Sequence, residues 1–218
     1  LGNSNTGVSL NNGISDTAMN NAFIDDTTVN AQYTLENKRT VSAKTGLVVD
    51  SSATHTLKSF VVNAAGGAAA GAGTVNVSRI TGSTGARISN TRILNGANAD
   101  VSVNAGDYSN LSGFVGSAGL GGTGIGLAAD TGIVKRTTTA KLDGIISDST
   151  STSVARDVLV KADAKLGISA VDAGLAVGAG ANAIAGTLAT NIMQSNTEAI
   201  VNNANLTVKS LSVMAAHK

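Results

Sequence analysis

The chain of 218 residues contains 26 glycines and no proline, cysteine or tryptophan; 42% of its residues are hydrophobic, 13% are charged, and the net charge is +1. The lack of cysteine excludes a disulfide scaffold and a thiol nucleophile, the aliphatic content excludes intrinsic disorder, and the small net charge argues against a nucleic-acid partner. A core built mainly from alanine, valine, glycine, serine and threonine must be narrow, because few large side chains are present to fill a wide one.

The apolar stretches are interrupted by glycine and carry polar residues such as Asn63, Asp172 and Asn182. A membrane-spanning helix needs about 20 mostly apolar residues in a row. We therefore expect no transmembrane segment in this fragment, and its first residues show no signal-peptide pattern.

A short apolar sequence recurs along the chain. Residues 101–105 (VSVNA) resemble residues 158–162 (VLVKA) and 211–215 (LSVMA), and residues 47–50 are a weaker copy. Successive copies begin 54, 57 and 53 residues apart. Such self-similarity indicates a repeat architecture.

A second recurring sequence supports the same period independently. Residues 22–26 resemble residues 86–90, 140–144 and 199–203, at steps of 64, 54 and 59 residues. The two series indicate one solenoid fragment of a longer array, residues 1–218. Its approximate units are 1–40 (partial), 41–94, 95–151, 152–208 and 209–218 (partial).

Within each unit the hydrophobic pattern has period 2. In residues 101–105 the apolar side chains Val101, Val103 and Ala105 alternate with Ser102 and Asn104, as they do in a strand with one buried face. A glycine- and alanine-rich segment follows in every unit, at residues 64–74, 116–129 and 173–187.

These glycine- and alanine-rich segments allow two interpretations. Residues 173–190 have enough alanine for a helix, but four glycines interrupt them, each at a cost of about 1 kcal/mol in a helix interior. We expect strand or extended structure there and keep a helix as the alternative.

Short strands in a repeated unit can form an antiparallel sandwich or barrel, or a parallel β-solenoid. The solenoid accounts for the repeats better than a sandwich or barrel does, since it places like residues of successive units one above another. The sequence therefore predicts an all-β fold, a parallel β-helix (β-solenoid) of imperfect 54–59-residue repeats. With two or three rungs of roughly 18–27 residues per unit, stacked about 4.8 Å apart, we expect a rod about 40–60 Å long.

Residues 191–200 (NIMQSNTEAI), together with residues 211–216 and the alternating Val/Ala strands, resemble the repeats of large bacterial exoproteins of the filamentous-haemagglutinin-like adhesin and fusobacterial leukotoxin type. The resemblance covers residues 41–217. It implies a right-handed parallel β-helix, two-partner or autotransporter secretion with an outer-membrane secretion partner, an extracellular or cell-surface location, and a virulence role through a host cell surface or extracellular matrix component.

Few residues suggest chemistry. His55 and His217 lack partners at metal-ligand spacing, so we expect both to be solvated. Residues 124–129 and 178–183 match G-x-G-x-x-A, but an amphipathic helix follows neither, so we predict no cofactor site. Residues 121–127 are similar to a calcium-binding nonapeptide but have Gly126 where that motif needs aspartate.

The remaining candidates also favour structural roles. We expect Asp25–Asp26 to form a solvated corner, and Lys38–Arg39 and Lys135–Arg136 to be solvated basic pairs. Phe60 and Phe114 lie 54 residues apart, which favours a packed core stack. Thr137–Thr139 do not continue as the regular ladder of an ice-binding face.

The sequence predicts no catalytic, cofactor-binding or metal-binding residue, and no enzyme. The favoured function is a structural stalk or adhesive repeat segment of a secreted or surface-exposed bacterial adhesin. Two alternatives remain: a segment of a leukotoxin-type cytotoxic exoprotein that contacts host cells, and a β-helix enzyme acting on polysaccharide.

Overall fold

The computed structural model describes residues 4–25, 28–30, 46–89, 92–94, 100–143, 146–147 and 155–218. In these residues every regular element is a strand: β1 (Ser4–Asp25), β2 (Thr28–Asn30), β3 (Gly46–Ser89), β4 (Arg92–Leu94), β5 (Asp100–Asp143), β6 (Ile146–Ser147), β7 (Ala155–Asn202) and β8 (Val208–His217). The prediction of an all-β fold is confirmed.

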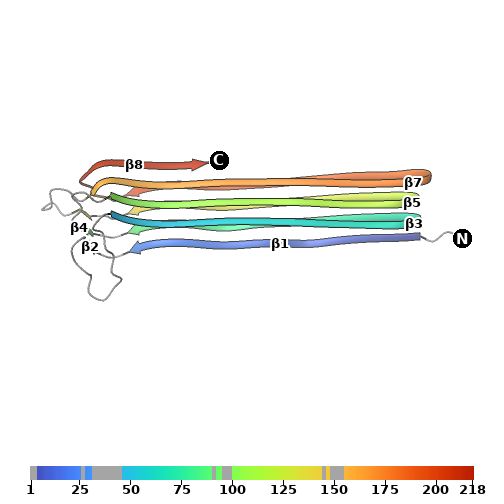
Figure 1. The fold of residues 1–218 in the computed structure, drawn as a ribbon, viewed down its shortest axis with the longest axis horizontal. Coiled ribbons are helices and arrows are strands. Elements are labelled where there is room, and N and C mark those ends of the chain that lie inside the picture. The colour runs from blue at the N-terminus through green and yellow to red at the C-terminus, as the bar shows by residue number, and fades with distance from the viewer. Residues whose placement is uncertain are drawn as a thin grey trace.

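All strand pairs are parallel. One sheet has the order β1-β3-β5-β7-β8, and a small second sheet has the order β2-β4-β6. Figure 1 shows that β3, β5 and β7 each run out along the long axis, turn back at the far end and return. Each therefore forms one flattened rung with an outward and a return limb, and the predicted β-solenoid is confirmed.

We call the end where the limbs reverse the turn end. Ladder pairing is interrupted there around residue 68 in β3, residue 122 in β5 and residues 179–181 in β7. The opposite end, where one rung continues into the next and the β2-β4-β6 sheet lies, is the loop end (Figure 1).

The register of the rungs coincides with the repeats found in the sequence. Leu47 pairs with Val101, Val101 with Val158, and Val158 with Leu211. The second series pairs in the same way, Ala22 with Ala86, then Ala140, then Ala199. The prediction that equivalent residues stack in columns is confirmed.

The expected number of rungs per unit is wrong. β3 and β5 pair at a constant offset of one whole repeat, so each unit forms one rung rather than two or three. A limb of about half the 44-residue β5 is about 70 Å long at about 3.3 Å per residue. The five strand levels of the main sheet span only about 20 Å at about 4.8 Å per step. The longest dimension of the molecule therefore runs along the strands. Each limb stays extended over its whole length, because its alternation of inward and outward side chains is not broken by a corner.

The interior between the limbs is apolar near the loop end. In β5, Val101, Val103 and Ala105 are buried, and the intervening Ser102 and Asn104 are half-buried, as the alternation predicts. The three apolar residues belong to a cluster contributed by both limbs of β3 and β5 and by the outward limb of β7: Val49, Ala86, Ile88, Val101, Val103, Ala105, Ala140, Leu142, Val158, Val160 and Ala162.

The interior becomes thinner toward the turn end. A Cβ atom added at Gly124 would lie 2.6 Å from the carbonyl oxygen of Val177 and 2.7 Å from that of Gly119, closer than real contacts allow. One added at Gly119 would overlap the backbone of Ile125 on the opposite limb. The helical alternative for the glycine-rich segments is therefore wrong: their glycines let two strand limbs approach to backbone contact.

Candidate interaction surface

An ion pair with fully buried side chains joins the two limbs of β5. Arg136 donates from Nε to Asp107 Oδ2 at 2.9 Å and from Nη2 to the same oxygen at 2.5 Å, and neither side chain is exposed. Asp107 also accepts bonds from the hydroxyls of Thr84 (2.8 Å) and Ser109 (2.7 Å). Arg136 Nη1 donates to the carbonyl of Thr81 on the rung below. The network ties two limbs and two rungs together.

A second buried polar cluster lies closer to the turn end. Asn76 Nδ2 donates to Asp130 Oδ1 at 2.7 Å and to Ser78 Oγ at 3.1 Å, and Asn76 Oδ1 accepts from Ser59 at 3.0 Å. Gly113 lies opposite, where a Cβ would overlap the Asp130 carboxylate. The interior of this part of the rungs is polar and filled by short side chains.

Asp172, on the β7 rung beside this cluster, is less well accommodated. Both of its carboxylate oxygens are buried without a hydrogen-bond partner. Loss of hydration raises the pKa of Asp172, and the negative charge of Asp130 adds to the effect. The proton is therefore held more readily at Asp172 than at an ordinary aspartate.

The structure corrects two predictions about charged residues. Arg136 is buried in the ion pair above, whereas Lys135 is exposed as predicted. His55 is half-buried with Nε2 3.1 Å from Arg136 Nη2, so it belongs to the interior network, whereas His217 is exposed. The buried ion pair was missed because Asp107 and Arg136 are 29 positions apart and only the reversal of the chain at the turn end brings them together.

The glycine motifs lie in strands. Residues 124–129 belong to the return limb of β5, and residues 178–183 lie at the turn end of β7, so neither follows a strand-to-helix turn. The calcium-like residues 121–127 form the turn end of β5. No group of three or more His, Cys, Asp or Glu side chains suited to a metal ion occurs in the described part of the chain. Asp25 ends β1; Asp26, Lys38 and Arg39 lie outside the described residues.

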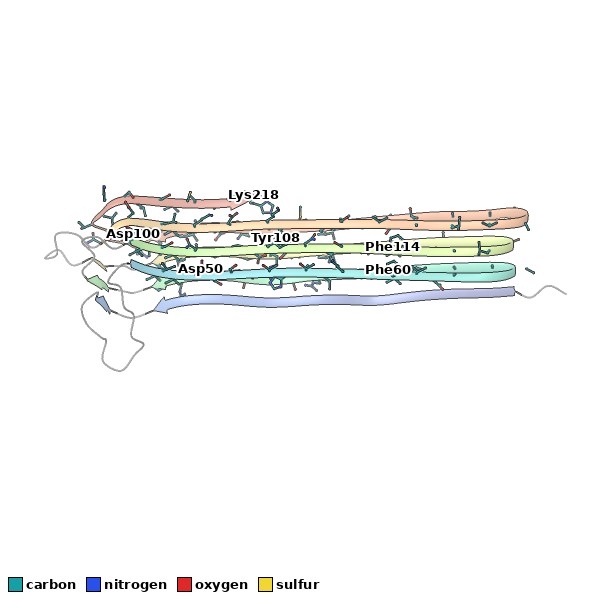
Figure 2. The ribbon with its side chains drawn as sticks, in the orientation of Figure 1. Asp50, Phe60, Asp100, Tyr108, Phe114 and Lys218 are labelled. Carbon is teal, nitrogen blue, oxygen red and sulfur yellow. The ribbon has the colours of Figure 1, made fainter. Side chains whose placement is uncertain are left out.

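Phe60 and Phe114 stack, but not in the core. Their ring centroids are 5.0 Å apart at an interplanar angle of 13°, and Figure 2 shows them on adjacent rungs between Tyr108 and the turn end. Phe60 is 74% exposed, so the predicted core position is wrong. Val61 and Val115 point inward instead; Val115 is fully buried and Val61 is half-buried.

The phenylalanines belong to an apolar outer surface of the outward limbs at the turn end. We call it the apolar patch; its members are Phe60, Val62, Phe114, Leu120, Val171, Leu175 and Val177. The outer face of the return limbs is apolar at the same end, with Val75, Leu127, Ile184, Leu188 and Ile192 exposed. A depression of about 390 Å³ lies beside the stacked rings, lined by Lys58, Ser59, Phe60, Ser112, Gly113, Phe114, Ser169 and Val171.

The turn end carries no outward charge in the described residues. Residues 59–78, 113–134 and 170–193 contain only the aspartates 130 and 172, whose carboxylates lie inside. The first outward-facing charges beyond these segments on β3 and β5 are the exposed cations Lys58, Arg79 and Lys135, whereas Asp107 of β5 faces inward. On β7 they are Lys165 and Glu198.

Comparison with known proteins adds no assignment, because no family model, no curated protein and no solved structure matches this chain. The described residues also contain no helix long and apolar enough to cross a membrane.

Proposed function

We propose that this chain is a structural and adhesive repeat segment of a secreted or surface-exposed bacterial adhesin. The main support is the pairing of successive repeats: equivalent residues pair without a shift over the whole length of β3 and β5. A unit of this kind extends an array by one rung at a time, and each added rung enlarges the same two outer faces. A repeated outer face is suited to multivalent surface contact.

The chemistry of the chain is compatible with such a role. Interior polar groups bond to other interior groups, Asn76 to Asp130 and Arg136 to Asp107, and these bonds hold the limbs in register. A chain without cysteine forms no disulfide before or after export. We expect it to pass an outer-membrane secretion partner unfolded and to assemble its rungs outside the cell.

Small-angle scattering tests the structural half of this proposal. A slab about 70 Å long and about 20 Å high has a radius of gyration of about 22 Å, whereas a compact globule of this length has about 17 Å. We expect the larger value. The smaller value would rule out the flattened rungs and the stalk with them.

Cell binding tests the adhesive half. We expect the labelled chain to bind cultured host cells saturably through its outer faces and to leave them intact. Binding with lysis would favour the runner-up, a segment of a leukotoxin-type exoprotein, for which the exposed apolar patch is the specific observation. Absence of binding would contradict the adhesive role.

A further inference from the structure

At the level of the stacked phenylalanines, the rungs are apolar outside and polar inside. The apolar patch exposes aromatic and aliphatic side chains such as Phe60 and Leu175. Inside, the same strands bury Ser59, Asn76 and Asp130, and the small side chains Ala65, Ala70 and Ala72 cluster nearer the turn. A rung surrounded by water on both faces is more stable with the opposite arrangement. Contiguous exposed apolar surface of this kind marks an interaction site.

The charges around the apolar patch indicate the chemistry of the partner. The patch presents no charged group, and its border on the outer face is formed by Lys58 and by Lys165, whose ammonium lies 5.8 Å from the Tyr108 ring centroid. The nearest carboxylate on that face, Asp163, already pairs with Lys161 at 3.5 Å. A partner that is apolar inside and negatively charged at its border is complementary to this arrangement.

An anionic phospholipid bilayer has that chemistry, with acyl chains beneath phosphate headgroups. A second copy of the chain fits less well, because it would present the same cations at its border. Tyrosine and lysine at the edge of an apolar surface are typical of the headgroup level. We propose that the apolar patch adsorbs on anionic lipid surfaces, with Phe60 and Phe114 in the acyl boundary and Lys58 and Lys165 at the phosphates. The inference rests on the proposed adhesive role and names its partner.

Adsorption by one face leaves the unpaired backbone hydrogen-bonding groups in contact with water. The rungs lie flat, so the patch enters only the outer 5–10 Å or so of the leaflet that an interfacial element reaches. The unpaired edge of β7 beyond Leu166 then stays at the hydrated interface, where its backbone groups can bond to water.

Vesicle sedimentation tests the proposal. The full chain is mixed with vesicles of phosphatidylcholine alone, or of phosphatidylcholine with phosphatidylserine, and bound protein is measured in the pellet. We expect binding to the anionic vesicles that weakens with salt. The double variant Phe60→Ser/Phe114→Ser should lower the partition coefficient at least ~10-fold, because the exposed Phe60 ring and the half-buried Phe114 ring lose their apolar contact with the lipid. Lys58→Glu should weaken binding to anionic vesicles only.

Val48→Ser is the matched control, because Val48 is 65% exposed on the outer face of the same limb but lies near the loop end. It should bind like the unmodified chain, and circular dichroism should show all variants folded, since none alters a buried side chain. Failure to bind either vesicle, or equal binding by the double variant, would overturn the inference. So would a dimer in sedimentation equilibrium that the double variant abolishes while vesicles stay unbound.

Different results would contradict the adhesive stalk and its lipid partner. Cell binding without vesicle binding would remove the lipid partner and leave the adhesive function in place. Vesicle binding by a chain that scatters as a compact globule would instead contradict the solenoid stalk.

Discussion

Replacing Asp107 with alanine leaves the Arg136 guanidinium in the interior without its counter-ion. The side chain is fully buried, and two of its donors lose the carboxylate oxygen that lies 2.5 and 2.9 Å away. The hydroxyls of Thr84 and Ser109 lose their acceptor at the same time. Removing one partner of a buried ion pair costs about 3–5 kcal/mol, because the remaining charge is desolvated and uncompensated.

The magnitude is tested by a double replacement in the same place. Asp107→Leu/Arg136→Met removes both charges and keeps apolar volume between the limbs, so we expect a free energy of unfolding within about 1 kcal/mol of the unmodified protein. A half-buried, solvent-accessible pair on the same return limb, Lys141 with Asp143 at 2.8 Å, is the control. Lys141→Ala should cost far less than Asp107→Ala, because water screens that pair.

Urea unfolding followed by far-ultraviolet circular dichroism measures all three variants, with the slope against urea compared to verify that the exposed surface is unchanged. We expect Asp107→Ala to be far more costly in unfolding free energy than both Lys141→Ala and the double replacement. Equal costs for Asp107→Ala and Lys141→Ala would show that Asp107 and Arg136 are hydrated, and would refute the close approach of the two limbs.

Two further predictions concern the turn end. Gly119→Ala should destabilise the protein by about 1–3 kcal/mol, because its Cβ overlaps the backbone of Ile125. The control Gly73→Ala, whose Cβ meets nothing within 4 Å, should be neutral or slightly stabilising in thermal melts. A larger loss of stability from Gly73→Ala than from Gly119→Ala would contradict the thin interior. Asp172→Asn should stabilise at pH 7 by about 1 kcal/mol, because the neutral amide removes the buried negative charge beside Asp130. Because the pKa of Asp172 is raised in the folded protein, its ionised form costs stability that is recovered as the pH falls through that pKa. The gain should therefore vanish below about pH 4, and a pH-independent gain would show that ionisation is not its cause.

The columns of the fold could be read from the sequence. The series beginning at Leu47 and at Ala22 fall in register without correction, since parallel stacking pairs each residue with its equivalent one repeat later. Alternation within residues 101–105 also identified the two faces of the strand. Both features are local or strictly periodic, so they need no knowledge of what lies across the interior.

The face of the phenylalanine column could not be read in the same way. Residues 60–62 are all apolar, so the alternation that identifies an inward face is absent there. The residues of the opposite limb determine which face of the phenylalanine column points outward. At Gly113, the residue before Phe114, an added Cβ would have no room beside Asp130 of the opposite limb. An interior this thin does not accommodate a benzyl side chain, and Phe60 and Phe114 lie outside.

The strand class, the repeat period and the pairing register follow from the amino-acid sequence, because these depend on side-chain alternation and on the recurrence of similar residues. The three-dimensional arrangement was needed to establish that one repeat makes one rung, that Arg136 is buried with Asp107, and that the apolar residues of the turn end face outward. The physical reason is the reversal of each long strand. Because each strand reverses, residues far apart in the chain face one another across the interior, and their sizes set the distance between the two limbs. That distance determines which side chains fit inside.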